Sequence, residues 1–154
     1  MKIYLKIGLL VLFAVSTAFA ARSLSRVAVA VGPAEFPEGD SVAIVEVLSD
    51  SSGLEVGSRV VVRGRYTLAT QARAKIGLSQ TRTESRAPVR VLPGSSMPIS
   101  KGSGEFELVY EITQIGCMRV AFNHVAPGAS FGTVYFGTPE QLASVKREAR
   151  GWVK

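Results

Sequence analysis

The sequence predicts an all-β protein, specifically an antiparallel sandwich of the immunoglobulin or fibronectin type with a short C-terminal α-helix. Between residues 42 and 136, apolar side chains mostly recur at every second position, the spacing that places them on one face of a strand. Glycines and prolines separate these runs, so six or seven short strands are expected. Many short strands joined by turns are typical of a β-sandwich.

The basic stretch near the middle of the chain predicts a hairpin. In residues 59–69, an apolar face alternates with a face that holds Arg59, Arg63 and Arg65 together with Val61 and Thr67. In residues 72–78, apolar side chains alternate with Arg73, Lys75 and Gly77. Because only Thr70 and Gln71 separate the two runs, we expect two antiparallel strands joined by a tight turn. Further strands are expected at residues 41–48, 105–112, 118–122 and 132–137, with Val42, Ile44, Phe106, Leu108, Tyr110 and Ile112 facing inward.

The first twenty residues have the features of a signal peptide. Lys2 and Lys6 precede an apolar run over residues 7–20, and Ala18-Phe19-Ala20 has the small-x-small form of a cleavage site. The apolar run is shorter than the roughly 20 residues that span a membrane, so we expect cleavage after Ala20 and export to the periplasm or the extracellular space; retention as an anchor is the alternative. The expected organisation is a signal peptide at 1–20, an extended arm at 21–40, the sandwich at 41–137 and an amphipathic helix at 138–154. Within the arm, Val27, Val29 and Val31 alternate, so a further strand at residues 26–31 is the alternative.

The predicted C-terminal helix begins at a recognisable start signal. Thr138 can cap the helix, Pro139 suits its first turn, and Gln141 completes the spacing of a capping box. An apolar face follows, which either packs on the domain or docks to a partner or an anionic membrane surface. Its members are Leu142, Val145, Ala149 and Trp152.

Composition limits the chemistry open to the chain. Without the two leader lysines the net charge falls from +6 to +4, which weakly favours an anionic partner. Cys117 is the single cysteine, in an apolar setting, so a buried thiol is expected; an intermolecular disulfide is the alternative. His124 is the single histidine, and no metal or cofactor is expected.

One short motif resembles a catalytic one. Residues 128–132 match G-x-S-x-G, but a nucleophile elbow requires a strand, a sharp turn and then a helix, with the histidine after the serine. Here a strand follows, and His124 precedes Ser130. We therefore expect a loop, and a serine hydrolase is only a remote alternative.

The candidate binding site is a basic face on the predicted hairpin. Either these cations pair with Glu105, Glu107 and Glu111 on a neighbouring strand, or they form a patch for an anionic partner. The basic face consists of Arg59, Arg63, Arg65, Arg73 and Lys75.

Residues 80–104 form the longest segment without a clear strand pattern, and residues 89–92 are its best candidate for a short edge strand. Without that strand, the segment is a long loop of the kind that often carries binding surfaces. The sequence thus predicts an exported, non-enzymatic binding module. Its partner is an unknown protein; the alternative is an acidic polysaccharide or other envelope polyanion bound through the basic hairpin face. Neither nucleic acid nor a membrane span after cleavage is expected.

Overall fold

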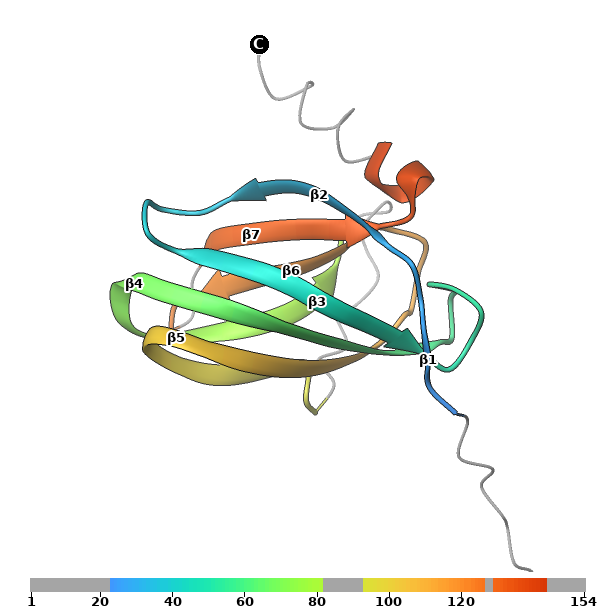
Figure 1. Cartoon of the computed structure of the whole chain (residues 1–154), viewed down its shortest axis with the longest axis horizontal. Helices are drawn as coiled ribbons and strands as arrows, with labels where there is room; N and C mark the ends of the chain where they lie inside the picture. Colours follow the sequence, from blue (N-terminus) through green and yellow to red (C-terminus); the bar gives the residue numbers. More distant parts are fainter. Residues whose placement is uncertain (1–22, 82–92, 127–128, 144–154) are drawn as a thin grey trace, which may run out of the picture.

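The computed structural model describes residues 23–81, 93–126 and 129–143, and antiparallel strands make up most of this part of the chain (Figure 1). The all-β prediction is confirmed. One short helix at residues 139–143 follows the last strand. The strands are β1 (Ser25–Arg26), β2 (Ala30–Glu35), β3 (Ser41–Ser49), β4 (Arg59–Gln80), β5 (Ser96–Glu111), β6 (Met118–Asn123) and β7 (Ser130–Gly137).

All seven strands belong to one sheet that curls into a half-barrel (Figure 1). The order is β1-β3-β4-β6-β7-β2, with β5 on the other edge of β4. β1 and β2 thus lie at opposite ends of this path, yet only residues 27–29 connect them. A connection this short reaches at most about 14 Å, so the two ends of the sheet must approach each other. Val27 and Val29 pack against the core as the chain crosses.

The long strand β4 gives the sheet its two halves. Residues 60–67 pair with β3 and residues 75–80 pair with β6, while β5 follows both stretches along the opposite edge. The predicted hairpin is wrong, because the chain continues through Thr70 and Gln71 as a single strand. The strand bends where the pairing with β5 lapses, between Leu68 and Arg73.

Asp40 compensates for the hydrogen bonds that are lost at this bend. Its carboxylate accepts bonds from the amides of Ala69 (2.6 Å) and Thr70 (3.0 Å) and from the Thr70 hydroxyl (2.6 Å). Burial opposes ionisation of Asp40, but these three bonds outweigh it and lower the pKa of the carboxyl group. A turn over residues 37–40, closed by the Asp40 amide on the Pro37 carbonyl, presents the carboxylate. Gly39 adopts φ 87° in that turn, a conformation that favours glycine.

The core lies between the inner faces of the two halves. Val60, Val62 and Leu68 from the first half of β4 and Ile76 and Leu78 from its second half are all buried. The inward residues predicted for 105–112 are buried too, and Val42 and Ile44 pack against the core from β3. The period-two pattern therefore identified the inner face correctly.

Two segments that were expected to be an arm and a loop contribute strands to the sheet. The expected arm at 21–40 contributes β1, which pairs with β3, and β2, which pairs with β7. In the expected loop at 80–104, the stretch from Ser96 onward is β5, because it pairs with β4 beyond the bend. The predicted edge strand at 89–92 and the signal peptide lie outside the described residues.

The C-terminal helix begins as predicted. The Thr138 amide donates to Gln141 Oε1 (2.9 Å), and the Gln141 amide donates to the Thr138 hydroxyl (3.3 Å), which together form a capping box. Leu142 is buried, near Gly32 of β2. This confirms packing on the domain for the first apolar residue, while Val145, Ala149 and Trp152 lie outside the described residues.

Gly64 tests the packing of the inner face. A Cβ at this position would lie 2.5 Å from Cζ of Phe106 on the opposing strand and would also overlap the backbone carbonyl of Ala43. We expect Gly64→Ala to lower the free energy of unfolding by about 1–3 kcal/mol, measured by chemical denaturation, because the overlap forces the strand to shift. Gly53→Ala is the control, since its nearest neighbour would be 3.7 Å away. Equal stability of the two variants would contradict the described packing.

Candidate functional site

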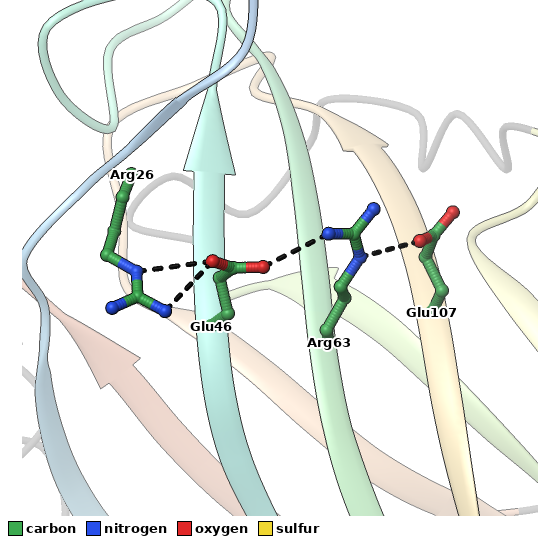
Figure 2. A network of polar contacts seen from close by, with 4 residues as sticks. All are labelled: Arg26, Glu46, Arg63 and Glu107. Atoms are coloured by element: carbon green, nitrogen blue, oxygen red, sulfur yellow. Dashed lines mark hydrogen bonds and ion pairs between the residues drawn. The ribbon is translucent and has the colours of Figure 1, made fainter.

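An ion-pair network crosses the outer face of the first half of the sheet (Figure 2). Arg63 on β4 donates from Nε to Glu107 on β5 (2.7 Å) and from a terminal nitrogen to Glu46 on β3 (3.1 Å). Glu46 also accepts a bond from Arg26 on β1 (2.9 Å). Four side chains of alternating charge therefore connect four strands.

The strand register extends this compensation to the neighbouring arginines. Arg65 lies directly opposite Glu105, with 3.5 Å between Nε and Oε1, and Arg59 lies directly opposite Glu111. The prediction that carboxylates of a neighbouring strand pair with the basic face is thus confirmed for Arg63 and Arg65. These arginines face glutamates of their own sheet, which leaves the first half close to neutral.

The network shifts the ionisation of its members. The hydrogen bonds from Arg26 and then Arg63 lower the pKa of Glu46, and the bond to Glu107 raises the pKa of Arg63. Exposed pairs of this kind contribute little stability individually, because solvent and salt screen them. Their main effect is to neutralise the surface.

Arg73 and Lys75 lie in the second half of β4, on a different part of the outer face. Arg73 is opposite Ser100, and Lys75 is opposite Pro98 on one side and Asn123 on the other. Both side chains are exposed, and no carboxylate among the described residues lies within ion-pair distance of either. The five predicted residues therefore do not form one site: β4 carries them all, but the bend separates the compensated members from these two.

Arg119 on β6 belongs to the same half and was not predicted. It lies opposite Ser79 of β4, and its Nε donates to the Ser79 hydroxyl (2.9 Å). The alternation of residues 118–122 did contain the signal, because it places Arg119 on the outward side. The sequence did not show that β6 pairs with the second half of β4.

Cys117 is a buried thiol, as predicted. Its side chain is near the core, and Sγ donates to the backbone carbonyl of Phe136 (3.1 Å). Burial raises the pKa of the thiol to about 11, so the reactive thiolate is scarce at neutral pH. Within the described segments, no three histidine, cysteine or acidic side chains gather in a way that could hold a metal ion.

Ser130 does not lie in a nucleophile elbow. It is the first residue of β7, so a strand follows it directly, and the expected loop ends before this position. The His124 ring packs against Phe131, with 4.9 Å between ring centroids. No hydrogen bond joins His124 to Ser130 in the part of the chain that the structure describes.

Comparisons with protein-family models, curated proteins and solved structures yield no match to this chain. Within residues 23–81, 93–126 and 129–143, no helix has the length and apolar character needed to cross a membrane.

Glu46 provides a test of the ion-pair network. We expect Glu46→Gln to lower the melting temperature at low ionic strength, because two arginines lose their shared partner, and we expect the difference to shrink in 1 M NaCl. The folded-state pKa of Glu46 lies below its ordinary value of 4.5, so its contribution is present at neutral pH and is lost as pH falls through the lowered pKa. The wild type should therefore lose stability more steeply on acidification than the variant.

Thermal denaturation across pH and salt checks this expectation. Glu55→Gln is the matched control, because Glu55 is exposed and its carboxylate accepts a bond from Ser52 rather than from an arginine. If both variants show the same salt and pH dependence, the network has no special role in stability.

Proposed function

We propose that this chain is an exported, non-enzymatic β domain that binds an anionic macromolecule through the outer face of its second half. Export is proposed from the leader-like sequence at residues 1–20. The non-enzymatic part draws support from the place of Ser130 at a strand start and of His124 on Phe131. The finer fold class, an immunoglobulin-like or fibronectin-like sandwich, is likewise a proposal that the two-sided core supports.

One observation carries the binding proposal, namely the unequal distribution of charge on the outer face. In the first half, Arg63 and Arg65 are each paired with glutamates. In the second half, Arg73, Lys75 and Arg119 point outward, and the described parts of β6, β7 and the start of β5 contain no acidic residue. Glu35 on the neighbouring β2 adds one carboxylate, so this surface is predominantly positive, and such a surface attracts anionic polymers and orients them.

The second candidate function is docking of a protein partner of unknown identity. The same basic surface would accept an acidic protein, so charge alone does not separate the two classes. We favour an anionic polymer because the cations are spread along a strand rather than gathered at one point. Arg119 lies opposite Ser79, which is six residues from Arg73 on β4. The two arginines are therefore separated by about 20 Å along the strand direction.

Retention on heparin–agarose tests the proposal. We expect the chain without residues 1–20 to bind at low salt and to elute in a NaCl gradient. Arg73→Gln combined with Lys75→Gln should elute at clearly lower NaCl, because it removes the uncompensated cations of β4.

The matched control removes the compensated charges of the first half. A variant with Arg63→Gln, Arg65→Gln, Glu105→Gln and Glu107→Gln keeps the net charge and should elute like the wild type. Absence of retention at low salt would contradict the proposed function. So would a reversed pattern, in which the control variant loses retention and the Arg73 and Lys75 variant keeps it.

A further inference from the structure

A shallow groove of about 600 Å³ lies over the outer face near β2, β6 and β7. The strand register explains its shape. Glu35, Thr133, Ala121 and Gly77 lie in one row across β2, β7, β6 and β4, and three of these four side chains are small. Thr133 lines the groove, and Ala121 beside it is buried, so no large side chain rises from this row between Glu35 and Gly77.

Larger side chains stand on both sides of this low row. Tyr135 and Arg119 are direct neighbours across β7 and β6 in the row on one side. Ser130 and Asn123 are neighbours in the row on the other side. Glu35 lines the groove on β2. Beyond the groove, the amide of Asn123 lies close to Gly77 of β4.

Among the described residues that line this groove, Arg119 is the one cation. Its Nε donates to the Ser79 hydroxyl, which holds the guanidinium in place. The N–H groups of its two terminal nitrogens can still donate to a ligand. No carboxylate of the described residues lies within ion-pair distance of Arg119. A positioned guanidinium with free terminal donors is suited to bidentate binding of a planar carboxylate.

We propose that this groove binds a carboxylate-bearing sugar unit of an acidic polysaccharide, with Arg119 binding the carboxylate. This inference depends on the proposed function and names its ligand class. Tyr135 provides a flat apolar ring with a hydroxyl group beside the guanidinium, and Ser130 and Thr133 add hydroxyl groups. These groups match a ring that carries both a carboxylate and hydroxyls.

Glu35 distinguishes a sugar polymer from a phosphate polymer. Its carboxylate lines the groove and accepts hydrogen bonds, which the hydroxyl groups of a saccharide can donate. A polyphosphate has no such donors and would place further negative charge beside Glu35. The groove therefore favours the saccharide, and the polymer would continue from Arg119 toward Lys75 and Arg73 on β4.

Binding of defined oligomers tests the inference. The chain without residues 1–20 is titrated by calorimetry with oligogalacturonate and, separately, with polyphosphate. We expect Arg119→Gln to weaken oligogalacturonate binding about tenfold or more, since a charged hydrogen-bonded pair is lost. Arg119→Lys should restore only part of the affinity, because lysine cannot form the bidentate contact. Thermal denaturation checks that both variants remain folded. If Arg119→Gln does not fold, Arg119→Lys keeps the charge and still tests the bidentate contact.

The outcomes separate this inference from the proposed function. If Arg119→Gln binds oligogalacturonate as the wild type does, while the Arg73 and Lys75 variant is weakened, the groove assignment is wrong and the basic surface stands. If polyphosphate binds more tightly than oligogalacturonate and depends on Arg119, the ligand class is wrong. If neither polymer binds but heparin–agarose retains the chain, the inference is wrong and the proposed function stands; if heparin–agarose does not retain it either, both are wrong.

Discussion

The architecture depends on how one long strand turns a corner without leaving its backbone amides unpaired. At the bend of β4, the partners on both edges change: β3 ends its pairing at Thr67, β6 begins at Lys75, and the register with β5 shifts. Backbone amides that lose their strand partners in such a gap need other acceptors. The Asp40 carboxylate supplies them for Ala69 and Thr70, so the turn before β3 and the bend of β4 stabilise each other.

The bend also divides the outer surface into two regions of different chemistry. Before it, β4 lies between β3 and β5, whose glutamates meet its arginines directly. After it, β4 lies between β5 and β6, where its neighbours are serine, proline and asparagine. A single strand with a regular basic pattern thus has one neutral half and one basic half. The functional proposals follow from this division and not from the number of cations.

Sequence reasoning identified the inner face because burial imposes a period of two on each strand. The ion pairs between β4 and β5 could also be predicted from the sequence. The intervals of four and two residues that separate Arg59, Arg63 and Arg65 recur in reverse order along the chain between Glu105, Glu107 and Glu111. The bend could not be predicted from the sequence. The carboxylate that accepts the amide hydrogen bonds at the bend belongs to Asp40, 29 residues before Ala69, and a break in alternation at Thr70 looks the same for a bend as for a turn. Arg119 was missed for a related reason: its role depends on which strand lies beside β6.

Amide hydrogen exchange at Ala69 and Thr70 tests most directly whether Asp40 holds the bend. The measurement compares the wild type with Asp40→Ala by NMR at neutral pH, where the lowered pKa keeps the carboxylate ionised. The account predicts that both amides exchange slowly in the wild type and much faster in the variant, by a larger factor than the paired amides of Val60 and Val62. Equal exchange rates at Ala69 and Thr70 in the two proteins would contradict it.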